Sequence, residues 1–171
     1  RIPMAVGYDG YVLSYTAEPV EIPDQALVDD WLPPNKAMPS IIPDEVDPNS
    51  FGRGWGGGDP QMPWKIHHDA IQGIEGIMKE TMDSFEKTFG RRYGNGMIEE
   101  YKMEGAEAAI IAQGTIAGTC KAAVDKMQAE GKNVGLIKLR TYMPFPDNDY
   151  QECAKKLDGI AVVDRSICPG K

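Results

Sequence analysis

From residue 104 to the end of the chain, short apolar segments alternate with segments of helical spacing, and this alternation constrains the fold most strongly. Strands are predicted at 108–112, 133–139 and 159–163, with helices at 115–130 and 147–156 between them. Strands that are joined by helices in this way pair in parallel through right-handed crossovers. The pattern therefore predicts an α/β fold with a small open parallel sheet and flanking helices.

The helix expected after the first strand carries the clearest apolar face of this region. Thr115 is expected to cap its start and Gly131 to end it. Its inner face is predicted from four residues spaced by three or four positions: Ile116, Cys120, Ala123 and Met127. This spacing places them on the side of the helix that faces the sheet.

A longer amphipathic helix is predicted upstream, over residues 69–89, with Asp69 near its start and Gly90 as its cap. Gly73 and Gly76 each cost about 1 kcal/mol relative to alanine inside a helix, so we expect another part of the protein to pack closely there. The helix carries one apolar stripe, formed by Ile71, Ile74, Met78, Met82, Phe85 and Phe89. We expect this stripe to be a buried docking face.

The first 66 residues differ in composition from the rest, because they contain 10 of the 13 prolines and the glycine-rich sequence GRGWGGG. A short strand is predicted at 2–6, and a helix at 23–32 that the double proline ends. Residues 33–66 are predicted to be an extended connector between two units. The domain organisation is therefore 1–32, the end of one α/β unit; 33–66, the connector; and 67–171, an α/β domain incomplete at its C-terminus.

Charge and cysteine content exclude several classes of protein. The net charge is −8 and no basic stripe is present, which argues against a nucleic-acid partner. The apolar runs are shorter than the roughly 18–20 residues of a membrane span, so no membrane association is expected. The three cysteines are Cys120, Cys153 and Cys168, and their sparse, odd number favours a reducing compartment. We therefore expect a cytoplasmic protein.

Two motifs of the sequence are candidate ligand sites. The sequence GTIAGT at 114–119 follows a strand and opens a helix, where phosphate can bind to free N–H groups. It matches neither the dinucleotide fingerprint nor the P-loop, so a tight strand-to-helix turn is the favoured interpretation. His67 and His68 are adjacent, and adjacent helical residues point about 100° apart, which disfavours a shared metal. We interpret them as polar residues at a helix entry and expect no metal site.

Arg140 and Arg165 are the candidate interface residues. Each comes directly after a predicted strand, and the carboxyl edge of an open parallel sheet is where ligands and partners bind. A guanidinium there can hold an anion or a carboxylate across a subunit interface. The alternative is a local salt bridge at the strand ends, and Asp164 would be such a partner for Arg165. Arg140 is therefore the stronger candidate.

Several motifs in register resemble one family, the alpha subunits of 2-oxoacid:ferredoxin oxidoreductases. The resemblance covers nearly the whole chain, apart from the glycine-rich stretch. The motifs are GYDGYVLS (7–14), EPVEIPD (18–24), WLPP (31–34), FGRRY (89–93), EEY (99–101), LRTYMPFP (139–146) and VVDRS (162–166).

The resemblance implies that residues 1–32 close a thiamine-pyrimidine-binding domain and that residues 67–171 form a transketolase-C-terminal-like domain. Members of the family cleave a 2-oxoacid on thiamine diphosphate with Mg²⁺, pass electrons through [4Fe–4S] clusters to ferredoxin, and form acyl-coenzyme A, or run the reverse reaction. The motif versions are most similar to the pyruvate branch. Met143 and Ala17 depart from the family pattern, so oxalate or another 2-oxoacid stays open as the substrate.

The resemblance also implies that this segment holds no catalytic, cofactor-binding or metal-binding residue of its own. Its role would be structural, in an assembly with subunits of the beta, gamma and delta type and a second copy of the complex, with ferredoxin as the electron partner. The alternative is a stand-alone, non-catalytic α/β interaction module. Residues 1–32 distinguish the two, because such a module has no use for the end of another domain.

Overall fold

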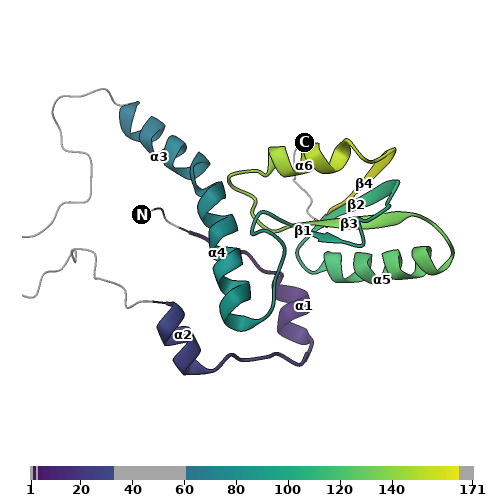
Figure 1. Ribbon diagram of the computed structural model, residues 1–171, viewed down its shortest axis with the longest axis horizontal. Helices are drawn as coiled ribbons and strands as arrows, with labels where there is room; N and C mark the ends of the chain where they lie inside the picture. Colours follow the sequence, from purple (N-terminus) through teal and green to yellow (C-terminus); the bar gives the residue numbers. More distant parts are fainter. Residues whose placement is uncertain (1, 3, 33–60, 166–171) are drawn as a thin grey trace, which may run out of the picture.

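The computed structural model describes residues 2, 4–32 and 61–165 (Figure 1). Its centre is a sheet with the strand order β1-β3-β2-β4. The strands are β1 (Ile98–Tyr101), β2 (Ala108–Gln113), β3 (Val134–Leu139) and β4 (Gly159–Val163). β2 pairs in parallel with both β3 and β4, which confirms the three predicted strands and the open α/β fold.

The sheet also contains a strand that was not predicted, because β1 joins its edge antiparallel to β3 and makes the sheet mixed. The sequence conceals this strand for a physical reason. Ile98 packs on one face of the sheet and Tyr101 on the other, and each shares its face with a glutamate. Neither face therefore shows the apolar alternation by which a half-buried strand is recognised.

Two helices cover the two faces of the sheet (Figure 1). They are α5 (Ile116–Ala129) and α6 (Asp147–Ala154), close to their predicted bounds. The buried residues of α5 are Ala117, Cys120 and Val124, whereas Ala123 is exposed, so the predicted inner face is partly wrong. Small side chains at the contact bring α5 close to Ala112 of β2 and rotate the buried face by a fraction of a turn.

Two short helices lie in the N-terminal segment, α1 (Gly10–Tyr15) and α2 (Gln25–Trp31). α2 confirms the predicted helix, whereas α1 was not predicted. Each begins at an aspartate whose side chain accepts backbone hydrogen bonds, Asp9 in α1 and Asp24 in α2. Within the part of 2–6 that the structure describes there is no strand, because no neighbouring strand satisfies its backbone groups.

The long upstream helix is divided into α3 (Met62–Gln72) and α4 (Ile74–Phe89), which meet at Gly73. The helical part therefore begins before residue 69, and the predicted connector is wrong over 62–66; its residues 33–60 lie outside the described residues. Gly90 ends α4 with φ +69°, as predicted. The expected close packing at Gly76 is not observed, because a Cβ built there would meet no atom within 4 Å.

The apolar stripe of α4 is half-buried rather than fully buried. Its last two turns contact α2, where the ring of Trp31 packs edge-on against Phe85 and Phe89 at centroid distances of 5.6 and 5.5 Å. The indole N–H of Trp31 also donates to the Ser84 hydroxyl at 2.9 Å. The stripe is thus a docking face for the N-terminal segment.

The first prediction concerns the core. Leu136 of β3 is 0% exposed, so Leu136→Ala should lower the free energy of unfolding by about 2–5 kcal/mol through lost burial and a residual cavity. Ile77→Ala removes a side chain of α4 that is 61% exposed, so it should change the free energy of unfolding by less than about 0.5 kcal/mol. Urea unfolding of the two variants measures both values. Equal losses would contradict the observed position of the core.

Candidate functional site

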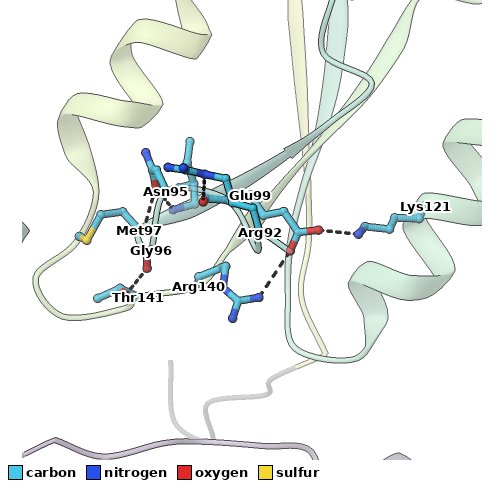
Figure 2. Close-up of polar contacts among 10 residues, drawn as sticks. Arg92, Asn95, Gly96, Met97, Glu99, Lys121, Arg140 and Thr141 are labelled. Atoms are coloured by element: carbon cyan, nitrogen blue, oxygen red, sulfur yellow. Dashed lines mark hydrogen bonds and ion pairs between the residues drawn. The ribbon is translucent and has the colours of Figure 1, made fainter. Parts of the chain in front are cut away.

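A fixed turn before β1 positions the edge of the sheet (Figure 2). The side-chain oxygen of Asn95 accepts hydrogen bonds from the backbone N–H groups of Met97 and Ile98, both at 2.9 Å. Gly94 and Gly96 adopt φ values of +72° and +91°, which favour glycine. The turn is therefore specified by its own residues, and it sets where β1 begins.

Glu99 of β1 is the centre of a cluster of charges on the α5 side of the sheet (Figure 2). Its carboxylate, 15% exposed, lies 2.5 Å from Nζ of Lys121 on α5 and 3.5 Å from a guanidinium nitrogen of Arg140. Burial raises the pKa of Glu99, but the hydrogen bond from Lys121 and the nearby positive charges outweigh it. The pKa of Glu99 is therefore lower than its usual value, and the carboxylate stays ionised.

Positive charge exceeds negative charge in this cluster. Lys138 of β3 lies opposite Glu99 in the strand register, and it is half-buried. Within the described residues its ammonium makes no hydrogen bond or ion pair. Burial lowers the pKa of Lys138, and the charges of Arg140 and Lys121 lower it further, against the opposing effect of Glu99. Three cations thus share one carboxylate.

The segment after β3 is attached to the same turn. The backbone N–H groups of Arg140 and Thr141 both donate to the carbonyl of Met97 at 3.0 Å. The hydroxyl of Thr141 donates to the carbonyl of Gly96 at 2.7 Å (Figure 2). Arg140 also stacks on the ring of Tyr93, 5.4 Å from its centroid. These contacts fix where the residues after β3 leave the sheet.

A second cluster, around Asp9, connects the N-terminal segment to the carboxyl edge of the sheet. The Asp9 carboxylate caps α1 and also accepts a hydrogen bond from the Thr115 hydroxyl at 2.7 Å. Arg165, which follows β4, lies 3.2 Å from the same oxygen. Thr115 precedes α5 as predicted but makes no side-chain cap to it. Its hydroxyl serves the Asp9 contact instead.

The structure thus brings the two candidate arginines to different carboxylates. Arg140 pairs with Glu99 of the same sheet. Arg165 instead pairs with Asp9, which lies in residues 1–32 on the other side of the predicted connector. The expected partner Asp164 is not the observed partner of Arg165. Neither Asp9 nor Glu99 was predicted as a partner of these arginines. An acidic pair in a four-residue segment, with cations on the facing strand, is the signal that points to Glu99.

The other candidate residues lie away from these clusters. His67 and His68 are exposed inside α3, not at its start. Cys120 and Cys153 are buried free thiols whose pKa values are raised by burial, and Cys168 lies outside the described residues. The described residues contain no group of three or more potential metal ligands. Gly114 adopts φ +63°, as the tight-turn interpretation of its motif requires.

A small cavity of about 130 Å³ lies between β1 and α6, and sequence reasoning did not identify it. Asp149 lines it and connects two elements, because it pairs with Lys79 of α4 at 3.2 Å and accepts from Asn95 at 2.8 Å. Burial raises the pKa of the adjacent Tyr150 to about 12. The cavity therefore lies beside a contact that holds α4 and α6 in place.

Several known proteins are similar to this chain. Residues 106–171 match the family model of the pyruvate:ferredoxin oxidoreductase core domain II. The chain is 33% identical over 170 residues to pyruvate synthase subunit PorA of Methanocaldococcus jannaschii and 35% identical over 170 residues to PorA of Methanosarcina barkeri. These alignments cover 99% of this chain but only 43% and 41% of the relatives.

Two further likenesses extend the comparison. The alpha subunit of an NADH-dependent phenylglyoxylate dehydrogenase from Aromatoleum evansii is 33% identical, over 97% of this chain and 41% of that protein. A solved 2-oxoglutarate:ferredoxin oxidoreductase from Magnetococcus marinus is 22% identical, with a TM-score of 0.39 over 49% of this chain and 16% of its own.

These matches agree with the motifs: the chain is similar to alpha-type subunits of 2-oxoacid:ferredoxin oxidoreductases, and its residues 106–171 match one core domain of that family. The similarity to PorA subunits of pyruvate synthase extends over almost all of its residues. The chain spans about two fifths of the length of these curated relatives. No helix among residues 2, 4–32 and 61–165 is long and apolar enough to span a membrane.

The second prediction tests the Asp9 cluster. The hydrogen bond from Thr115, followed by that from the Val12 N–H, lowers the pKa of Asp9 below its value in the unfolded chain. The stability that the ionised group contributes is therefore fully present above about pH 4–5 and is lost as the pH falls through the folded pKa. Asp9→Asn keeps an N-cap oxygen but removes the charge facing Arg165.

The expected result is a lower unfolding temperature for Asp9→Asn at pH 7, with a smaller loss of stability between about pH 5 and pH 2 than in the parent protein. Asp24→Asn is the matched control, because Asp24 caps α2 and meets no cation among the described residues. Thermal unfolding across this pH range measures the difference. Identical pH profiles for Asp9→Asn and the parent would contradict the cluster.

The third prediction tests the turn before β1. A Cβ at Gly94 would overlap the carbonyl of Ile98 and lie 2.7 Å from Cα of Glu99. Gly94→Ala should therefore destabilise the protein by at least twice as much as Gly105→Ala. Gly105 has a similar φ of +70° but open space around it, so its substitution costs only the conformational penalty of about 1–2 kcal/mol. Chemical denaturation of both variants measures the two losses of stability. Equal losses would contradict the close contact at Gly94.

Proposed function

We propose that this chain is part of the alpha subunit of a thiamine diphosphate-dependent 2-oxoacid:ferredoxin oxidoreductase that acts on pyruvate. The reaction is oxidative decarboxylation to acyl-coenzyme A with electrons passed to ferredoxin, or the reverse. The observation that carries the proposal is the similarity to PorA subunits over 99% of the chain at 33–35% identity.

The role proposed for these residues is structural and concerns assembly. In this proposal the cytoplasmic complex uses thiamine diphosphate, Mg²⁺, [4Fe–4S] clusters and coenzyme A. The residues that bind these groups lie outside this chain. Residues 1–32 close the pyrimidine-binding domain, and residues 67–171 form the transketolase-C-terminal-like domain. The chain assembles with partner subunits of the beta, gamma and delta type and with a second copy of the complex. Ferredoxin is the electron partner of that complex.

The surface of the N-terminal segment supports an assembly role. The segment is attached on one side, through Asp9 to Thr115 and Arg165, and through Trp31 to α4. Large apolar side chains remain exposed elsewhere along it: Met4, Val6, Tyr8, Tyr11, Tyr15, Val20 and Ile22. Such a concentration of exposed apolar residues is typical of a surface that another protein or domain covers. A stand-alone module would leave this surface in water.

A second candidate substrate class follows from one relative. The similar subunit from Aromatoleum evansii is named as part of an NADH-dependent phenylglyoxylate dehydrogenase. Phenylglyoxylate is also a 2-oxoacid, and its enzyme is named for a different electron carrier. An aromatic 2-oxoacid, with a nicotinamide as the electron carrier, is therefore the alternative that the assay must include.

The test uses the full-length protein purified with its co-expressed subunits. We expect pyruvate- and coenzyme A-dependent reduction of ferredoxin, followed spectroscopically, with much lower rates for phenylglyoxylate, 2-oxoglutarate and oxalate. Omitting coenzyme A is the control for acyl transfer. A faster reaction with phenylglyoxylate and NAD⁺ would favour the second candidate, and no reaction with any 2-oxoacid would contradict the proposal.

The fourth prediction concerns the 171-residue chain by itself. Cys120 lies in the core cluster on the α5 side of the sheet and Cys153 in the cluster on the α6 side, so the two thiols cannot ligate one cluster. A [4Fe–4S] cluster needs four thiolates. We therefore expect no iron in elemental analysis. Because the sequence has no diphosphate- or Mg²⁺-binding motif, we also expect no thiamine diphosphate binding in calorimetry. About four iron atoms per chain would overturn this expectation.

A further inference from the structure

We propose that Lys138 and the segment Arg140–Phe145 form a docking surface for an acidic, apolar segment of a different subunit of the complex. This inference rests on the function proposed above and gives it a specific contact. The segment of residues 140–145 is called the docking loop below. The proposal follows from its attachment to the sheet, its composition and the charge beside it.

The docking loop has a fixed base. The N–H groups of Arg140 and Thr141 share the Met97 carbonyl, and the Thr141 hydroxyl holds Gly96 (Figure 2). The prolines on either side of Phe145 are both buried. The loop is therefore held at both ends, and little conformational entropy would be lost when a partner binds to it.

The tip of the docking loop is apolar and exposed. Tyr142, Met143 and Phe145 are 72%, 67% and 48% exposed, although they occupy nearly consecutive positions. Single exposed apolar residues are common, but a contiguous group on a fixed loop indicates an interaction site. Tyrosine, methionine and arginine are also the residue types enriched in protein–protein interfaces.

The charge beside the tip selects an acidic partner. Glu99 is already paired with Lys121 at 2.5 Å, so its more distant contact with Arg140 leaves most guanidinium donors available. The ring of Tyr93 supports that guanidinium from one side. Lys138 is half-buried without a hydrogen bond or ion pair within the described chain. A carboxylate from another chain would satisfy both cations.

The surroundings favour a protein segment over a free phosphate compound. The open cavity next to the cluster, of about 350 Å³, has two acidic residues in its lining, Glu99 and Glu100. Its lining cation, Arg92, is engaged by Asp83 and Glu86 at 2.8 Å each. A polyphosphate would be repelled from that cavity. The available positive charge lies instead beside an exposed apolar loop, as an acidic-apolar peptide requires.

The first experiment maps the contact in the assembled complex. A photo-crosslinking amino acid replaces Tyr142 in the full-length protein, co-purified with its partner subunits, and the crosslinked peptides are identified by mass spectrometry. We expect a light-dependent crosslink to an Asp- or Glu-containing segment of another subunit. The same amino acid at Ala129, exposed at the end of α5, is the control. Crosslinks only within the same chain, or to a second copy of it, would overturn the proposal.

The second experiment measures affinity. Tyr142→Ala combined with Met143→Ala should raise the dissociation constant for the partner subunits by roughly tenfold or more, without changing the melting temperature of this chain. Arg140→Lys should weaken the same association, because lysine cannot reproduce a bidentate contact. Lys155→Ala, on the far end of α6, is the control. An effect below about twofold in both variants would refute the docking surface.

The outcomes also separate this inference from the proposed function. If inorganic phosphate at millimolar concentration displaced the partner and protected the loop, the surface would be an anion site and the inference would be wrong. A crosslink to another subunit in a complex that lacks 2-oxoacid oxidation would leave the docking surface standing and refute the proposed function. A complex that oxidises 2-oxoacids but gives no such crosslink would support the proposed function and refute the docking surface.

Discussion

The ion pairs of Glu99 are the interaction on which this edge of the sheet depends. Its carboxylate joins β1 to α5 through Lys121 and to the residues after β3 through Arg140. Removing a half-buried carboxylate from such a group would leave three cations close together without a partner. Glu99 therefore links β1, α5 and the start of the docking loop, and it balances part of the positive charge on this surface.

The alternation of apolar and helical segments was sufficient to predict β2, α5, β3, α6 and β4, because each of the three strands has a short continuous apolar sequence, even though β4 is mostly exposed. The N-terminal helices and β1 depend on contacts that local sequence does not contain. β1 is held by pairing with β3 and by the cations facing Glu99. α1 depends on Asp9, whose other partners lie far along the chain.

The site was only partly predictable for the same reason. The two arginines could be placed at strand ends from the order of elements, but their carboxylates could not, since register and helix rotation decide which residues meet. Glu99 meets Arg140 because β1 runs antiparallel to β3. Lys138 is conspicuous only once the structure shows that it is half-buried beside other cations. The resemblance to the oxidoreductase family, in contrast, could be seen from motifs that need no geometry.

The position of Asp9 has a consequence for the order in which the chain folds. Asp9 can cap α1 as soon as residue 12 has been synthesised, but its contacts with Thr115 and Arg165 span 106 and 156 residues. The entropic cost of closing such loops grows slowly with length, so the contacts are accessible once their partners exist. On the ribosome, however, the N-terminal segment can reach its final place only after β4 has emerged. Until then its apolar side chains stay available to chaperones and to other newly made subunits.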